Sequence, residues 1–290
     1  QNSVVFPSYE VFSVDFIDYN NDGWLDVSFV YNSDDISPNV LFYRNNHDGT
    51  FSNESGLVVQ DLQHAQGGWS DLDGDGLSDF VYFGSWDTGQ EALFLFKNLG
   101  NGAFHSMQCP YLKGVSQGSI DFADYDRDGD NDYIIQGEID NGPYTAIYEN
   151  LGNWQFEEHS RDFVPKEQGR ILWGDLNSDG MTDIVSCGVE ISSVQSTHIY
   201  RNQNGTFTPI DTLPGYRMAS VNVVDVNNDG HLDLYVAGSP YIFTAGSIDV
   251  YLNNQAGGFT AGTSSFSVCN CPRLHFADLD NDNDLDVIES

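Results

Sequence analysis

The sequence predicts an all-β protein, a β-propeller built from four-stranded antiparallel blades with an acidic loop between the first and second strands of each blade. An acidic pattern of nine residues, D-x-[DN]-x-D-[GN]-x-x-D, recurs along the 290-residue chain, and apolar runs and glycine turns recur in the same phase. No segment has the pattern of an amphipathic helix. The six copies of the acidic pattern begin at Asp18, Asp71, Asp124, Asp175, Asp225 and Asp278, at spacings of 53, 53, 51, 50 and 53 residues.

Each repeat contains four strand signals in a fixed order. In the first repeat, Phe16 ends a strand just before the acidic loop, and the apolar run Val27–Val30 follows that loop. After a variable segment comes a third apolar run that ends at Asn45, and a Gly-containing turn then leads to a fourth strand at Phe51. Both residues of an Asn-Gly or Asp-Gly pair tolerate positive φ, so these pairs predict tight hairpins. They occur at Asp48-Gly49, Asn101-Gly102 and Asn204-Gly205.

The repeats predict a single propeller domain over residues 1–290 with about six blades, or seven if the natural chain is longer. A β-solenoid is the rival fold, but its repeats are usually shorter and lack the paired hairpins. The sixth acidic pattern stops close to Ser290, so its blade is short of strands. We expect residues 1–17 to supply the outer strand of that last blade, so that the two termini meet within it.

The charge balance restricts the partners of the protein. The chain has 44 Asp and Glu against 10 Lys and Arg, a formal net charge of −34. A field of this sign repels nucleic acid and anionic membrane surfaces, and no run of 18 apolar residues predicts a membrane span. We therefore expect neither a nucleic-acid partner nor membrane insertion.

The acidic loops have the composition of Ca²⁺ sites. Positions 1, 3 and 5 supply side-chain oxygens, position 6 allows a sharp turn, position 7 offers a backbone carbonyl and position 9 a closing Asp. Such hard oxygen ligands in a flexible cage suit Ca²⁺ better than Mg²⁺. About six Ca²⁺ are therefore expected. The predicted ligands are Asp18, Asn20, Asp22, Trp24 and Asp26; Asp71, Asp73, Asp75, Leu77 and Asp79; Asp124, Asp126, Asp128, Asp130 and Asp132; Asp175, Asn177, Asp179, Met181 and Asp183; Asp225, Asn227, Asp229, His231 and Asp233; and Asp278, Asp280, Asp282, Asp284 and Asp286.

These loops, together with hairpins such as Arg201–Phe207, resemble the FG-GAP/VCBS repeat family, whose members include the N-terminal propellers of integrin α chains. The resemblance covers nearly the whole chain. It implies that the loops hold Ca²⁺ as a structural ion. The Phe-Gly and Gly-Ala-Pro signatures of integrins are largely absent, which argues against integrin-like heterodimers and favours VCBS-type relatives. The family includes adhesins, lectins and propellers of polysaccharide-degrading proteins, so the fold does not fix the function.

We expect a secreted or cell-surface protein, because extracellular Ca²⁺ fills weak sites and two glycosylation sequons begin at Asn53 and Asn204. The predicted function is a non-catalytic recognition or adhesion module, lectin-like in binding a glycan or an extracellular protein. Two alternatives remain: a subunit of an extracellular filament or surface assembly, with self-assembly possible, and a polysaccharide lyase or hydrolase. The expected ligand loops combine aromatic and polar residues, although packing between blades explains such residues equally well. They are Ser85–Asp87, Asp140–Tyr144 and Pro240–Phe243.

Few other residues suggest catalysis or a covalent cross-link. No catalytic motif is visible, and Lys166-Glu167 is interpreted as solvated charge in a variable loop. Cys187 falls within a predicted strand and is expected to be a buried thiol, whereas Cys269 and Cys271 could form a tight disulfide or link to other blades. We therefore predict no catalytic residues.

Overall fold

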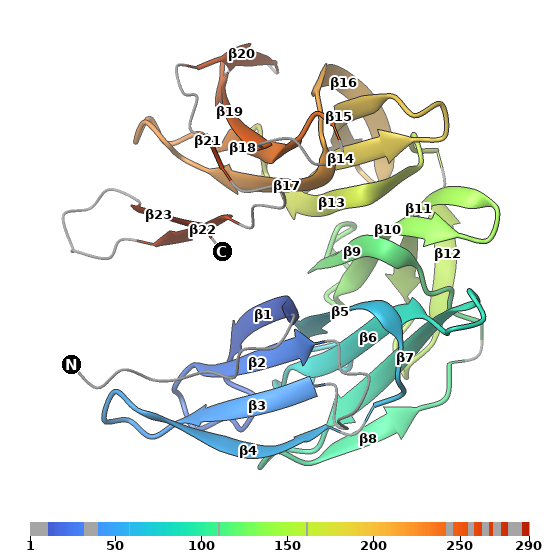
Figure 1. Cartoon of the computed structure of the whole chain (residues 1–290), viewed down its shortest axis with the longest axis vertical. Coiled ribbons are helices and arrows are strands. Elements are labelled where there is room, and N and C mark those ends of the chain that lie inside the picture. Colours follow the sequence, from blue (N-terminus) through green and yellow to red (C-terminus); the bar gives the residue numbers. More distant parts are fainter. Residues whose placement is uncertain are drawn as a thin grey trace. The chain divides into compact units, whose positions relative to one another are not determined.

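A computed structural model describes residues 11–31, 40–57, 59–109, 111–160, 162–241, 246–254, 258–262, 267–268, 274–277 and 286–289. All the regular structure in these segments is β-strand, and none of them contains a helix that could cross a membrane. The strands form five four-stranded antiparallel sheets, which are the blades of a β-propeller (Figure 1). The predicted fold class is therefore confirmed.

Each blade follows the predicted order of strands along the chain. The first three blades contain β1 (Val11–Ile17), β2 (Asp26–Tyr31), β3 (Val40–Asn45) and β4 (Phe51–Leu57); β5 (Gln63–Ser70), β6 (Asp79–Ser85), β7 (Glu91–Asn98) and β8 (Phe104–Met107); and β9 (Ser116–Ala123), β10 (Asp132–Ile139), β11 (Gly142–Asn150) and β12 (Phe156–Ser160). The next two contain β13 (Lys166–Gly174), β14 (Asp183–Glu190), β15 (Gln195–Gln203) and β16 (Thr206–Pro214); and β17 (Arg217–Val224), β18 (Asp233–Ser239), β19 (Gly246–Asn253) and β20 (Phe259–Ala261).

The prediction of about six blades was wrong by one, since the described residues form five complete blades. The sixth repeat contributes a two-stranded sheet of β22 (Leu274–Ala277) and β23 (Asp286–Glu289), and the short β21 (Ser267–Val268) pairs with β19. The prediction that residues 1–17 supply the outer strand of the last blade was also wrong for residues 11–17, which the structure describes. Residues 11–17 are β1, which pairs with β2 as the first strand of the first blade, and residues 1–10 lie outside the described residues.

The chain divides into two compact units, each with an apolar core between its sheets. Unit 1 contains residues 1–117 and 149–157, and unit 2 contains residues 118–148 and 158–290. Aromatic side chains dominate the core of unit 1, where Tyr19 stacks on Phe42 at 4.7 Å between ring centroids. In unit 2, Tyr125 stacks on Trp173 at 5.8 Å, and aliphatic residues of β14, β17 and β18 form a second cluster. The second residues of these two acidic loops, Tyr19 and Tyr125, are thus buried in the blades.

The predicted hairpin turns form with the expected backbone. Asn101-Gly102 and Asn204-Gly205 both have positive φ at both residues, as a tight turn of type I′ requires. At the turn between β3 and β4 the positive φ angles fall on His47 and Gly49 rather than on Asp48.

A bulge recurs at the start of the first strand. His64, Gln168 and Met218 occupy the same position in three blades, and each has a φ near +50° next to a shift in strand register. The bulge brings the first strand so close to the second that a Cβ on Gly84 or Gly188 would lie 2.8 or 2.6 Å from a carbonyl oxygen of the first strand. This contact explains why a glycine ends the second apolar run of those repeats.

In four of the five described blades, an asparagine at the end of the third strand joins the blade to the one before it. The side-chain amide of this latch asparagine donates a hydrogen bond to the carbonyl of the second loop residue in the preceding blade. Four such bonds occur within the units: Asn98 to Tyr19, Asn150 to Leu72 and Asn202 to Tyr125 at 2.9 Å, and Asn253 to Leu176 at 2.7 Å. All four asparagines are buried, so each bond is shielded from water.

We predict that Asn202→Ala lowers the free energy of unfolding by about 1–3 kcal/mol, because it leaves the buried Tyr125 carbonyl without its donor. Chemical denaturation followed by tryptophan fluorescence measures this loss. The control is Gln203→Ala at the next, exposed residue of β15, which should change stability by less than about 0.5 kcal/mol. Equal effects of the two substitutions would contradict the role of the latch.

Candidate metal centres

Five acidic loops lie within the described residues, each between the first and second strands of a blade, as predicted. In every one, the carboxylate at position 1 closes the loop by accepting hydrogen bonds from the backbone N–H groups of positions 5 and 6. In the first loop the donors to Asp18 are Asp22 at 3.0 Å and Gly23 at 2.8 Å. The same pair of bonds forms on Asp71, Asp124, Asp175 and Asp225.

Positions 3, 5 and 7 complete the turn. A side-chain oxygen of Asn177 accepts the N–H of Asp179 at 2.9 Å, and Asp179 accepts the N–H of Met181 at 2.8 Å. The bond between positions 5 and 7 forms in all five loops, at the N–H groups of Trp24, Leu77, Asp130, Met181 and His231. Position 7 is therefore held by its backbone, while the predicted ligation by its carbonyl remains a prediction.

The Asp at position 9 is fully buried, and its carboxylate connects the acidic loop to the third strand of the blade. Asp183 accepts one backbone N–H from Leu176 in its own loop at 3.2 Å and one from Asn202 on the third strand at 2.9 Å. Asp79 and Asp233 accept the corresponding pairs. Burial raises the pKa of Asp26, Asp79 and Asp183 to about 6, against the lowering effect of these backbone donors. A nearby cation would favour the ionised form.

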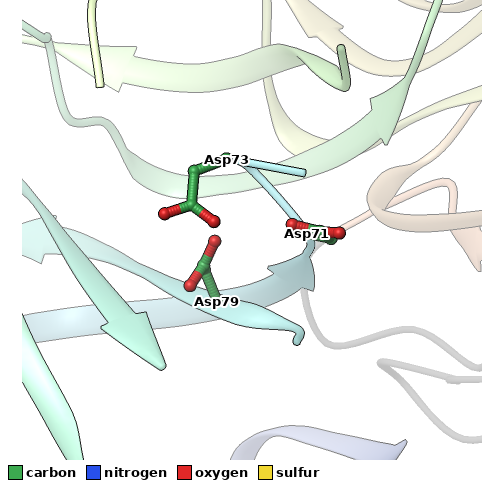
Figure 2. A group of neighbouring side chains, drawn as sticks. All are labelled: Asp71, Asp73 and Asp79. Carbon is green, nitrogen blue, oxygen red and sulfur yellow. The ribbon is translucent and has the colours of Figure 1, made fainter. Parts of the chain in front are cut away.

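Two loops bring three carboxylates close enough to share one ion. Oxygens of Asp71, Asp73 and Asp79 lie within 4.8 Å of one another, as do those of Asp124, Asp126 and Asp128. Figure 2 shows Asp73 and Asp79 pointing toward each other, with Asp71 beside them. The Oδ1 atom of Asp73 is buried and has no hydrogen-bond partner, a costly state that a bound cation would relieve. The residues present therefore fit a divalent cation with hard oxygen ligands.

The other predicted sites differ in detail. In the first, fourth and fifth loops position 3 is Asn20, Asn177 or Asn227, which offers a neutral oxygen in place of a carboxylate. In the sixth copy Asp278, Asp280, Asp282 and Asp284 lie outside the described residues, and Asp286 begins β23. The pairing of Cys269 and Cys271 lies outside them as well, whereas Cys187 is the buried thiol of β14 that was predicted.

The structure also reveals a polar cluster that the sequence did not predict. Lys166, interpreted above as solvated, is fully buried at the start of β13, and Glu167 is half-buried beside it. The Lys166 ammonium donates to the Ser196 backbone carbonyl at 2.8 Å and to the Ser196 hydroxyl, and it lies 3.8 Å from Glu190. The Ser196 hydroxyl donates to Glu190 and lies 3.3 Å from Nδ1 of His198.

In some enzymes a serine hydroxyl is the nucleophile, and a neighbouring lysine or histidine activates it. Here Lys166 is 0% and Ser196 4% exposed, so the hydroxyl is closed to a substrate. Lys166 stands nine residues before its acidic loop, and the described residues at the same place in three other repeats are Leu62, Val115 and Tyr216, all buried. Lys166 thus replaces a core residue of the repeat, and we interpret the cluster as structural.

Comparison with known proteins supports the repeat. A family model described as "FG-GAP-like repeat" matches residues 71–135, 124–186 and 175–236, which together span more than half of the chain. No curated protein matches the sequence. Among the solved structures, rhamnogalacturonan lyase PL11 of Bacillus licheniformis is similar, with a TM-score of 0.53 and 14% sequence identity. The alignment covers 97% of this chain and 55% of that one, so this chain spans about half the length of the lyase. At this identity the likeness concerns the fold.

The buried Lys166 predicts a dependence of stability on alkaline pH. Burial lowers the pKa of Lys166 to about 8, below its value in the unfolded chain, so between these two values the unfolded chain binds more protons. Stability should therefore rise with pH, by about 1–3 kcal/mol in the free energy of unfolding between pH 8 and pH 10. Urea unfolding of the wild type and of Lys166→Met across this range measures the effect, since the variant should lack this rise. Parallel pH profiles would contradict the prediction.

Proposed function

Because the chain belongs to the family of FG-GAP-like repeat proteins, we propose that it is a calcium-stabilised recognition module that works outside the cell. In this proposal it binds a glycan or a protein ligand and does not catalyse a reaction. The observation that supports it most is the repeated acidic loop, with the same hydrogen bonds on its first Asp in all five described copies.

Calcium has a clear structural role in this proposal. Each loop collects three to five carboxylates, and without a cation they repel one another. The ion would neutralise them at the point where the first and second strands join and where the position-9 Asp holds the third strand. Millimolar Ca²⁺ outside cells fills sites that cytosolic Ca²⁺ would leave empty, which is the reason for proposing an extracellular location.

Ligand binding is proposed at the opposite end of the blades. The acidic loops join the first and second strands, whereas the variable hairpins join the second and third, so antiparallel pairing puts the two kinds of loop at opposite ends. In unit 2 the hairpins of the fourth and fifth blades are joined by a hydrogen bond of 3.1 Å from Gln195 to the Pro240 carbonyl. They present Ile191, Val194 and Tyr241, which are 78%, 52% and 71% exposed. We name these three residues the hairpin patch.

Not all of the aromatic residues expected to bind a ligand in these loops are exposed. Tyr144 is buried, and its hydroxyl contacts Tyr148 and Glu158. Trp86 is half-buried and packs edge-on against Phe94. Phe243 lies outside the described residues. Tyr241 is therefore the aromatic side chain on which the recognition proposal depends.

A polysaccharide-active enzyme is the second candidate, favoured by the similarity of fold to a rhamnogalacturonan lyase. Incubation with rhamnogalacturonan and other acidic polysaccharides, followed by the appearance of unsaturated products, tests this candidate directly. A third candidate, a subunit of an extracellular assembly, would show as concentration-dependent oligomers in sedimentation experiments. Either result would replace the proposal of a non-catalytic recognition module.

We predict that millimolar Ca²⁺ raises the melting temperature well above its value in EDTA. Binding to the native state stabilises it by about 2.7 kcal/mol per site at a hundred times the dissociation constant. Differential scanning calorimetry measures the shift, and elemental analysis should find about six Ca²⁺ per chain. Mg²⁺ at the same concentration is the control and should give a smaller shift. If Ca²⁺ neither binds nor stabilises, the proposed role of the loops is wrong.

The hairpin patch gives a second prediction. Once a glycan array or a protein screen identifies a ligand, Tyr241→Ala should weaken its binding about tenfold or more, because exposed aromatic anchors carry much of the binding energy at interfaces. Tyr111→Ala removes another exposed tyrosine, 89% exposed, from unit 1 and should leave the affinity unchanged. Surface plasmon resonance compares the two variants. Equal affinities would place the ligand elsewhere on the molecule.

A further inference from the structure

One acidic loop already contacts a cation that belongs to the protein. Lys97 lies near the end of β7, directly before the latch Asn98. Its ammonium group donates to Oδ2 of Asp73 and, at 2.8 Å, to Oδ2 of Asp75. Asp73 and Asp75 are positions 3 and 5 of the second loop, so the lysine contacts two of the four carboxylates predicted to bind Ca²⁺ there.

The lysine is held in place on its other side. The Trp154 ring lies 5.9 Å from the ammonium, within the range of a cation–π contact, and the Lys97 side chain is 25% exposed. An ammonium between two carboxylates neutralises part of the charge that a metal ion would otherwise neutralise. The remaining oxygens of the loop still form a site, since those of Asp71, Asp73 and Asp79 gather and Oδ1 of Asp73 has no partner.

The corresponding residue differs from blade to blade. Directly before the other latch asparagines stand Arg201, Glu149 and Leu252, and Arg44 precedes Asn45 of the first blade. Arg44 is paired with Glu54 at 3.2 Å, and Asp22 of the first loop contacts His47 at 3.2 Å. The third blade has the acidic Glu149 at the corresponding place in its sequence. The loops therefore share one backbone but differ in electrostatic surroundings.

We propose that Lys97 is an internal counter-cation of the second loop, which competes with Ca²⁺ for Asp73 and Asp75 and weakens Ca²⁺ binding there. The inference rests on the proposed binding of calcium by these loops. It means that the charge of the second loop stays partly neutralised when Ca²⁺ is scarce, so the strands on either side of the loop depend less on the ion. Lys97 thereby lowers the Ca²⁺ affinity of one site, while the residues of the acidic loop stay the same.

The test is a Ca²⁺ titration by isothermal calorimetry on the full chain. Lys97→Met keeps the length of the side chain and removes its charge, so one site should bind Ca²⁺ about tenfold more tightly. Lys97→Arg keeps the charge and should behave like the wild type. Lys113→Met, at an exposed lysine outside the acidic loops, also removes one positive charge and controls for the net charge of the protein.

Thermal unfolding provides a second readout, because the effect of the substitution on the melting temperature should depend on Ca²⁺. In EDTA, Lys97→Met should melt roughly 2–4 °C below the wild type, because its carboxylates lose their counter-cation. With millimolar Ca²⁺ this difference should vanish or reverse. A substitution that merely damages packing against Trp154 would lower the melting temperature equally in both conditions.

The outcomes separate this inference from the proposed function. If the wild type binds Ca²⁺ and Lys97→Met binds it with the same affinities, the role of Lys97 is overturned and calcium stabilisation stands. If no variant binds Ca²⁺, both are overturned. A gain in affinity that appears equally in Lys113→Met would assign the effect to net charge and also overturn the specific role of Lys97.

Discussion

The fold depends on a carboxylate that is buried at the same place in every described blade. In three blades this Asp, shown by Asp79, Asp183 and Asp233, accepts one N–H from its own acidic loop and another from the third strand. A buried carboxylate is unfavourable unless its oxygens are paired, and two backbone donors supply that pairing. The same two bonds set the position of the loop against the sheet, and with it the positions of the other loop oxygens.

The latch asparagine connects this local arrangement to the neighbouring blade. The backbone N–H of Asn202 binds Asp183 in its own blade, while its side chain donates to the Tyr125 carbonyl of the preceding loop. One residue thus joins two acidic loops, so neutralising one loop also supports the contact with the next. Repeat proteins are stabilised in this way by interactions between nearest neighbours. The charge of the residue before the asparagine, such as Lys97, can then vary without disturbing either bond.

Much of this structure could be predicted from the sequence, because the acidic pattern fixes the spacing of the strands and the places of the acidic loops between them. Other features depend on packing that no local pattern contains. Lys166 resembles a surface residue in sequence, but the fold buries it at a core position beside Ser196. Tyr144 resembles an exposed loop aromatic, but the shorter hairpin between β10 and β11 turns it inward. The contact of Lys97 with Asp73 joins residues 24 apart and likewise depends on the pairing of β6 with β7.

The latch has a consequence for how such a chain grows and shortens in evolution. The second, third and fourth repeats each supply one donor to the blade before and one acceptor to the blade after, as Asn202 and the Leu176 carbonyl do in the fourth blade. Duplication of a whole repeat therefore inserts a blade that can form this hydrogen bond with both of its neighbours. After deletion of a whole repeat, the two blades that become neighbours still have an asparagine donor and a carbonyl acceptor for the same bond. We therefore expect changes in length by whole repeats to disturb these junctions less than partial insertions, which would separate an asparagine from its loop.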